Sequence, residues 1–211
     1  MEPNESLQPT GAAFPTSQGF GRARRPRRLN WGVRRQRHAM TMDEFIPLME
    51  RKSPPAPQDQ LEAFEAELGT ELPDDYRQFL LCTNGGHISG WYRFKGLTPW
   101  GETWFAYVNH VCGFRGEPHL SLRFNRGCCL SSETQFPREL LWIMDDPGGN
   151  GICLGLTGKR RGRVYFWIHD EQPDPDEWNG EVETASNVIP LADSFTDFIA
   201  GVGPRDDSDQ E

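Results

Sequence analysis

The sequence predicts an α+β fold in a single domain, on three observations. Apolar residues recur at helical spacing from residue 61 to residue 80, three apolar strands fall between 140 and 169, and a capped amphipathic pattern occupies 194–202. A chain of 211 residues suits one such domain with tails. A folded body of about 150 residues can bury a core without metal or disulfide bonds.

The N-terminal segment differs in composition from the rest of the chain. Residues 1–38 contain eight arginines and two glutamates and show no apolar periodicity, which predicts disorder. A basic arm is typical of nucleic-acid or membrane-surface contacts and of targeting segments. Translation from an upstream start would also add it, since Met40 and Met42 lie where the composition changes. We favour this last interpretation, or an inert tail, because basic runs match functional patterns easily.

The composition divides the chain into four parts. Residues 42–51 predict a short amphipathic helix, and the prolines that follow predict a stiff spacer before the main domain. The parts are a disordered arm at 1–40, a short helix and proline-rich linker at 41–57, the folded domain at 58–202 and an acidic tail at 203–211.

The formal net charge of −9 combines the basic arm with a strongly acidic remainder. An acidic body lacks the Lys and Arg that phosphate contacts need, which argues against nucleic acid as the ligand of the folded domain. It suits a basic protein partner instead. No apolar run approaches the ~20 residues of a membrane span, and no apolar segment follows the arginines as a signal peptide would require.

Cysteine usage points to a cytoplasmic protein. The five cysteines are an odd number, and no Cys-x-x-Cys spacing occurs. This pattern indicates reduced thiols rather than a disulfide framework. Cys82 falls at the end of an apolar helix and Cys153 in a strand, so we expect both in the core, and we favour a structural role for Cys128 and Cys129.

Two amphipathic helices are predicted at the start of the folded domain. The first spans 61–68 and ends at Gly69, while Pro73 suits the first position of the second, which stops at 83–86. Two aspartates complement the dipole of the second helix. The apolar stripes are Leu61, Phe64 and Leu68 in the first helix, and Tyr76, Phe79 and Leu80 in the second.

The middle of the chain gives weaker signals. Residues 90–96 predict a strand, 104–111 fit a strand or a helix, and 115–129 predict irregular structure with one short element. The segment 97–138 is therefore the part of the fold that the sequence determines least.

Three strands are predicted at 140–145, 151–156 and 163–169. The third alternates Val164, Phe166 and Ile168 with Tyr165, Trp167 and His169, so both faces are largely apolar and we expect a central strand covered on both sides. Residues 147–151 tolerate the positive φ of a tight turn. The basic link at 157–162 suits an exposed hairpin loop, and 188–191 predict a strand at the sheet edge.

The last two features are an acidic loop and a closing helix. Residues 170–183 carry seven acids and no base, and two prolines prevent regular structure there. Ser194 and Asp197 match a capping pattern for a final helix. The apolar face of that helix consists of Phe195, Phe198, Ile199 and Val202.

The order of these signals resembles the SUKH superfamily, whose members include the yeast cell-wall-assembly and killer-toxin-resistance regulators. The similarity spans about 58–202, although 97–138 shows no family signature. The matching residues are Leu61, Phe64, Leu68, Leu72, Pro73, Asp75, Tyr76, Phe79, Asn84, Gly85, Gly86, Asp146, Gly148, Gly149, Asn150, His169, Asp170, Ser194, Phe195 and Phe198.

This resemblance implies helices packed on a mainly antiparallel (mixed) sheet and a binding role. Bacterial members are mostly immunity proteins that neutralise polymorphic toxins, many of them nucleases or deaminases, and fungal members act as regulatory scaffolds. The family brings no catalytic residues, and nothing in it implies a cofactor.

An enzymatic site is a weaker hypothesis. Five polar residues near predicted strand ends could hold a divalent metal, but Asp, Asn and Gly are also the ordinary turn residues, and we favour that structural role. They are Asp145, Asp146, Asn150, His169 and Asp170. A Cys–His nucleophile would need an orienting third group, and no metal-ligand spacing links His87, His110 and His119.

The acidic loop is the functional site that we predict. A nuclease needs a positive cleft to attract phosphate, so an acidic inhibitor is steered to that cleft and can occlude it. Tryptophan is a frequent hot-spot residue in such contacts. The hypothesis is an immunity protein that binds a basic toxin, and the alternative is a regulatory scaffold without a toxin partner. The predicted contact residues are Asp170, Glu171, Asp174, Asp176, Glu177 and Trp178.

Overall fold

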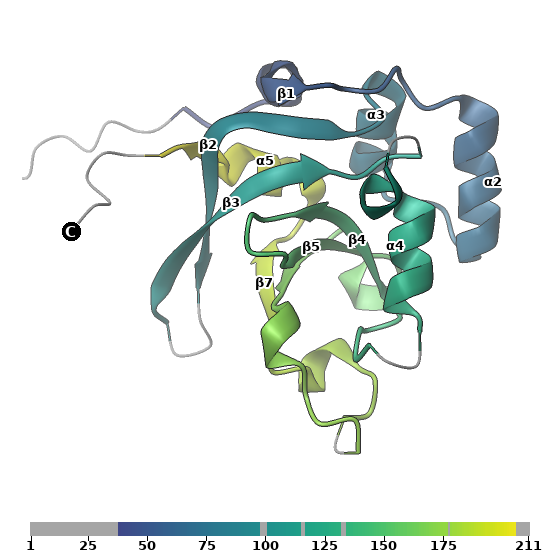
Figure 1. Cartoon of the computed structure of the whole chain (residues 1–211), viewed down its shortest axis with the longest axis vertical. Coiled ribbons are helices and arrows are strands. Elements are labelled where there is room, and N and C mark those ends of the chain that lie inside the picture. Colours follow the sequence, from purple (N-terminus) through teal and green to yellow (C-terminus); the bar gives the residue numbers. More distant parts are fainter. Residues whose placement is uncertain (1–37, 98–100, 115–116, 132–133, 177, 206–211) are drawn as a thin grey trace, which may run out of the picture. The chain divides into compact units, whose positions relative to one another are not determined.

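The computed structural model describes residues 38–97, 101–114, 117–131, 134–176 and 178–205 (Figure 1). The arginine-rich segment for which the sequence predicts disorder lies outside these residues, as does the end of the acidic tail. Residues from His38 onward form one compact unit.

The described chain contains short helices and a long sheet. The α-helices are α1 (Met42–Phe45), α2 (Gln58–Leu68), α3 (Asp74–Cys82), α4 (Leu122–Cys129) and α5 (Phe195–Gly201). The strands are β1 (Met49–Glu50), β2 (Gly86–Leu97), β3 (Thr103–Val111), β4 (Leu140–Asp145), β5 (Gly151–Gly155), β6 (Val164–Trp167), β7 (Val188–Ala192) and β8 (Gly203–Pro204). Single 3₁₀ turns are η1 (Ile46–Leu48), η2 (Pro118–Leu120), η3 (Gly158–Arg160), η4 (His169–Glu171) and η5 (Val182–Thr184).

The sheet is an antiparallel meander. Strands β1 to β7 neighbour one another in chain order, and β8 adds to β2. This confirms the α+β class and the antiparallel sheet. Strand β6 is buried on both faces as predicted, but it lies beside the edge strand β7 and is not central.

The main core includes an aromatic cluster formed by side chains of α3 and α5. The ring of Phe195, which has no exposed surface, lies 5.0 Å from that of Tyr76 and 5.1 Å from that of Phe79. The carboxylate of Asp75 accepts a 2.9 Å hydrogen bond from the backbone N–H of Thr196, in the first turn of α5. This contact joins the start of α3 to the start of α5.

A second, smaller core lies on the other face of the sheet. The alternation of β6 separates the two cores, since Val164 and Phe166 belong to the first, and Tyr165 and Trp167 to the second. Val182 of η5 joins this second core and so fixes the C-terminal part of the acidic loop to the sheet.

Several helix boundaries follow the sequence prediction closely. Helix α2 ends at Gly69, whose φ of +71° is the left-handed conformation that glycine tolerates. Helix α5 is capped by Ser194, whose hydroxyl accepts the N–H of Asp197 as predicted. Pro73 is the capping residue before α3 and not its first helical residue, so that detail was wrong.

Other local predictions need correction. The helix predicted at 42–51 ends at Phe45, and the chain continues through η1 into β1. Residues left open as strand or helix form β3, and the short element expected within 115–129 is α4, capped by Ser121. Cys82 is exposed, so placing it in the core was wrong, whereas Cys153 is buried as expected.

Candidate partner-binding surface

The acidic segment lies between β6 and β7 and is held at its base (Figure 1). Asn187 is fully buried, and its side-chain amide donates a 2.8 Å hydrogen bond to the carbonyl of Ile168 across the neck of the loop. The backbone N–H of Ile168 donates back to the carbonyl of Asn187 at 2.9 Å. The two ends of the loop are therefore tied together where it leaves the sheet.

Polar side chains also shape the loop internally. Asp174 accepts the N–H of Asp176 at 2.9 Å through its carboxylate, and the N–H of Trp178 at 3.0 Å through its carbonyl. Asn179 accepts the N–H of Glu181 at 3.0 Å and donates to its carboxylate at 3.2 Å. These contacts give the exposed acids a defined backbone.

Only part of the loop's negative charge is neutralised. Asp170 pairs with His169 at 2.9 Å, and Glu183 pairs with Lys159 at 2.9 Å and with Arg160. The other described acids of the loop are exposed, and within the described residues no Lys, Arg or His lies at ion-pair distance from them. These acids are Glu171, Asp174, Asp176 and Glu181. Glu177 lies outside the described residues.

Trp178, which the sequence predicts as a contact residue, is not fully exposed. Its indole N–H donates to the carbonyl of Glu181 at 3.0 Å, and its side chain is half-buried. It lines a cavity of about 450 Å³ between the acidic loop and residues 129–139. Phe136 and Arg138 line the same cavity. Sequence reasoning missed this cavity because its two walls are far apart in the chain.

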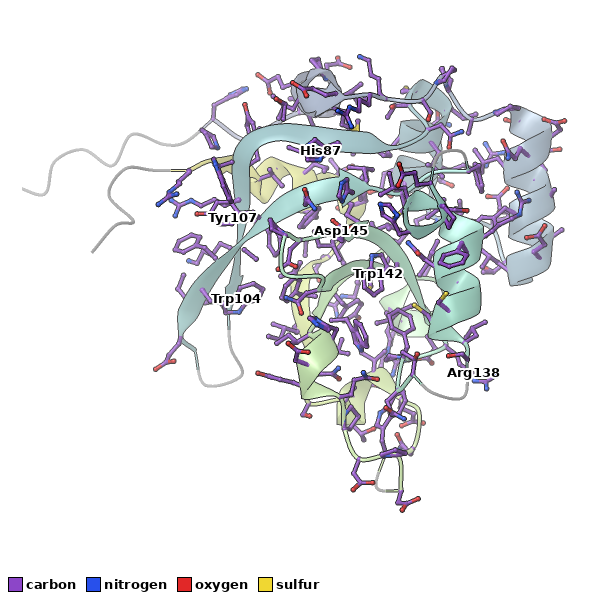
Figure 2. All side chains as sticks on the ribbon, in the orientation of Figure 1. His87, Trp104, Tyr107, Arg138, Trp142 and Asp145 are labelled. Atoms are coloured by element: carbon purple, nitrogen blue, oxygen red, sulfur yellow. The ribbon has the colours of Figure 1, made fainter. Side chains whose placement is uncertain are left out.

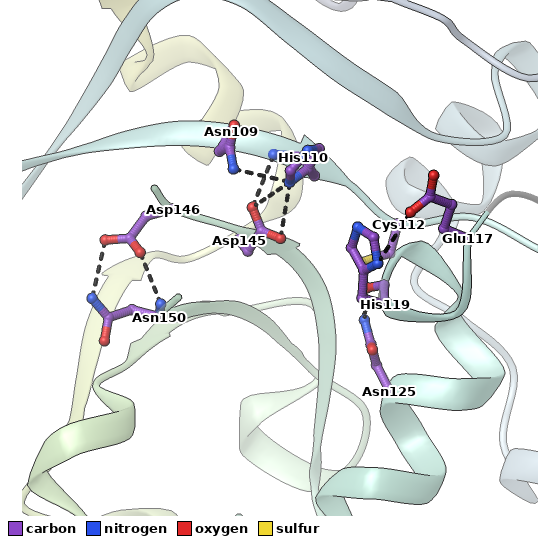
Figure 3. Close-up of polar contacts among 9 residues, drawn as sticks. All are labelled: Asn109, His110, Cys112, Glu117, His119, Asn125, Asp145, Asp146 and Asn150. Carbon is purple, nitrogen blue, oxygen red and sulfur yellow. Dashed lines mark hydrogen bonds and ion pairs between the residues drawn. The ribbon is translucent and has the colours of Figure 1, made fainter. Parts of the chain in front are cut away.

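The polar residues considered for a metal site separate into two groups (Figure 3). Asp146 accepts the backbone N–H of Asn150 at 2.8 Å and its side-chain amide at 3.0 Å, and Asn150 accepts the N–H of His169 at 3.1 Å. This chain of contacts shapes the β4–β5 turn and joins it to the end of β6. Within the described residues, no group of three or more His, Cys, Asp or Glu side chains is arranged to hold a metal ion.

Asp145 belongs to a histidine cluster instead (Figure 3). Its carboxylate accepts the backbone N–H of His110 at 3.0 Å and lies 3.1 Å from the ring Nδ1. The His110 ring lies 5.0 Å from the His87 ring and 5.8 Å from the His119 ring. Burial raises the pKa of Asp145, and the neighbouring His110 opposes that rise. Pairing of β2 with β3 creates this cluster, so residue spacing did not reveal it.

We expect Asp145→Asn to alter the pH dependence of stability. A carboxyl whose pKa is raised on folding contributes stability below its unfolded pKa, and this contribution is lost as the pH rises through the folded value. The asparagine keeps an acceptor for the His110 N–H but cannot ionise. Relative to the unsubstituted chain, the variant should therefore gain unfolding free energy in urea as the pH rises above about 4, the ordinary pKa of an aspartate carboxyl. If the difference in unfolding free energy between the variant and the unsubstituted chain stayed constant with pH, or changed in the opposite direction, the pKa of Asp145 would not be raised on folding.

The buried cysteines lack the character of nucleophiles. Burial raises the pKa of Cys129 to about 12 and that of Cys112 and Cys153 still further above their ordinary range. Cys112 lies beside Asn125, whose amide donates to its sulfur at 3.3 Å. Because the thiolate is the reactive form, a neutral buried thiol fits a packing role.

The features described above define the structural class of the protein. The protein is an α+β domain with an acidic surface loop that is anchored at its base. Its sequence assigns it further: residues 55–201 match the SMI1/KNR4 family (SUKH-1), and the chain belongs to that family. The family is known for immunity proteins of polymorphic toxins.

The chain is also similar to a bacterial protein. The chain is 25% identical over 156 residues to the SPbeta prophage-derived uncharacterized protein YokK of Bacillus subtilis (strain 168). The alignment covers 67% of this chain and 71% of the relative.

Among the described helices, none has both the length and the apolar character needed to cross a bilayer.

Proposed function

We propose that this protein is an immunity protein that neutralises a polymorphic toxin by binding it through the acidic loop. The family membership supports the class of function. The observation that carries the proposed surface is a set of exposed acids that have no basic partner among the described residues, on a loop tied at both ends.

The loop's charge explains how such a protein would find its target. Exposed carboxylates attract a positively charged cleft over about 10 Å at moderate ionic strength, which raises the association rate. Because the loop backbone is already ordered by Asp174 and Asn179, little conformational entropy is lost when a partner binds. The half-buried Trp178 and the adjoining cavity offer an apolar contact beside the charges.

We expect charge reversal of the loop to slow toxin binding. The variant carries Asp174→Lys, Asp176→Lys and Glu177→Lys, and a toxin encoded next to this gene is the partner. Its association rate at low salt should fall by about tenfold or more, because steering scales with local charge. The loss should shrink at high salt, where the charges are screened. Stopped-flow or surface-based kinetics at several salt concentrations measure both effects.

The matched control changes the net charge equally at exposed acids outside the loop, with Asp43→Lys, Asp59→Lys and Glu62→Lys. It should slow association much less, since these residues belong to α1 and α2. Equal rates for the two variants would assign the effect to overall charge. Unchanged binding by the loop variant would reject the loop as the contact surface.

A regulatory scaffold is the second candidate, since the family is named for SMI1 and KNR4. A scaffold would not protect cells from a neighbouring toxin. Co-expression of the toxin domain with and without this protein separates the two: rescue of growth supports immunity, and its absence supports the scaffold.

A further inference from the structure

The β2–β3 hairpin extends beyond the rest of the sheet and leaves one edge of β3 open (Figure 1). Strand β3 pairs with β2 from Thr103 to Val111, but it meets β4 only at the pair Val111–Met144. Within the described part of the chain, residues 103–109 therefore have a neighbouring strand on one side only.

The backbone groups on the open side lack partners within the described residues. Beyond the ladder to β2, no described residue forms a hydrogen bond with the backbone of 103–109. A strand of seven residues presents an edge of about 23 Å. Natural proteins protect such edges with charges, prolines or bulges, and 103–109 contains no charged residue and no proline. The edge is thus suited to pairing with another strand.

Aromatic side chains lie on the outer face beside this edge. Trp91 is 58% exposed and Phe105 is 47% exposed, and the ring of Tyr107 lies 5.0 Å from that of Trp91. The guanidinium of Arg93 lies 4.1 Å from the centre of the Phe105 ring. Trp91 and Phe105 are exposed, Tyr107 is partly buried and Arg93 is buried beneath them, and aromatic side chains grouped in this way are typical of interface hot spots.

The inner face of the hairpin is packed, which holds the open edge in place. Figure 2 shows Trp104 and Tyr107 on β3. The Trp104 ring lies 4.8 Å from that of Phe166 in β6, and Ala106 and Val108 belong to the main core. The edge is therefore a fixed part of the fold.

We propose that the occupant of this edge is a second copy of the chain, added antiparallel to β3 to form a sheet that continues across two protomers. The neutral strand is complementary to itself, because a twofold axis near Ala106 brings Phe105 of one copy beside Tyr107 of the other without opposing like charges.

The test compares two glutamate substitutions at equally exposed phenylalanines in the full chain. Phe105→Glu places a carboxylate beside Arg93, which a single copy tolerates, but introduces a pair of like charges at the dimer contact. Phe124→Glu makes the same change on α4, where Phe124 is 50% exposed. Sedimentation should show the unsubstituted chain and Phe124→Glu dimerising between about 1 µM and 1 mM, and Phe105→Glu dimerising at least tenfold more weakly.

Amide hydrogen exchange of the unsubstituted chain provides a measurement without substitution. The N–H groups of 103–109 that face away from β2 should become protected as the protein concentration rises. A monomer at all these concentrations overturns the proposal, as does a dimer that persists in Phe105→Glu without protection of β3. Protection that appears only when a toxin is added would assign the edge to that partner and also overturn it.

Discussion

Replacing Phe195 with alanine should lower the free energy of unfolding by about 3–5 kcal/mol, the cost of removing a large aromatic side chain from a packed core. The ring is fully buried and contacts Tyr76 and Phe79, so the gap cannot fill with water or collapse without moving two helices. Urea unfolding followed by tryptophan fluorescence measures the loss. Since a domain of this size has about 5–15 kcal/mol in total, the variant should be close to unfolding.

Phe124→Ala is the matched control for Phe195→Ala. It removes the same atoms from a half-exposed site on α4, and surface changes of this kind stay within about 0.5 kcal/mol. If Phe195→Ala cost no more than Phe124→Ala, the contact between α3 and α5 would not be the centre of the core. The acidic loop does not contact this cluster, so binding by the folded fraction should be unchanged.

The elements that the sequence predicted well are those whose apolar pattern has one period. Helix α3 follows its 3.6-residue stripe, and β4 starts with the apolar run and ends at Asp145, as predicted. Continuing that stripe from Tyr76 by seven residues leads to Thr83, which is buried, and not to Cys82. The period therefore places Cys82 off the buried stripe, whereas its position at the end of an apolar helix led us to expect it in the core.

Strand β3 could not be assigned because both of its faces carry aromatic residues. Its inner face holds Trp104 against the core, while Phe105 and Tyr107 lie outside, so no alternation of apolar and polar residues marks a strand. The acidic loop was predictable from composition alone. Its cavity was not, because the lining residues come from two segments that are far apart in the chain.

We expect Gly113→Ala to destabilise the fold by about 3 kcal/mol or more, through a steric conflict that cannot relax locally. A Cβ at this position would lie 2.1 Å from the backbone carbonyl oxygen of Asn84. Asn84 is fully buried, and its side-chain oxygen accepts a 2.7 Å hydrogen bond from the N–H of Phe114. The Asn84-Gly85-Gly86 segment therefore holds the end of α3 against the end of β3.

Gly127→Ala provides the control of opposite sign. It adds the same methyl group within α4, where a Cβ meets nothing within 4 Å, so helix propensity should stabilise the protein by about 0.5–1 kcal/mol. Urea unfolding of both variants measures the contrast. Equal effects would mean that the contact between Asn84 and Gly113 is loose. Opposite effects would show that the Asn84-Gly85-Gly86 segment acts through backbone packing against Gly113.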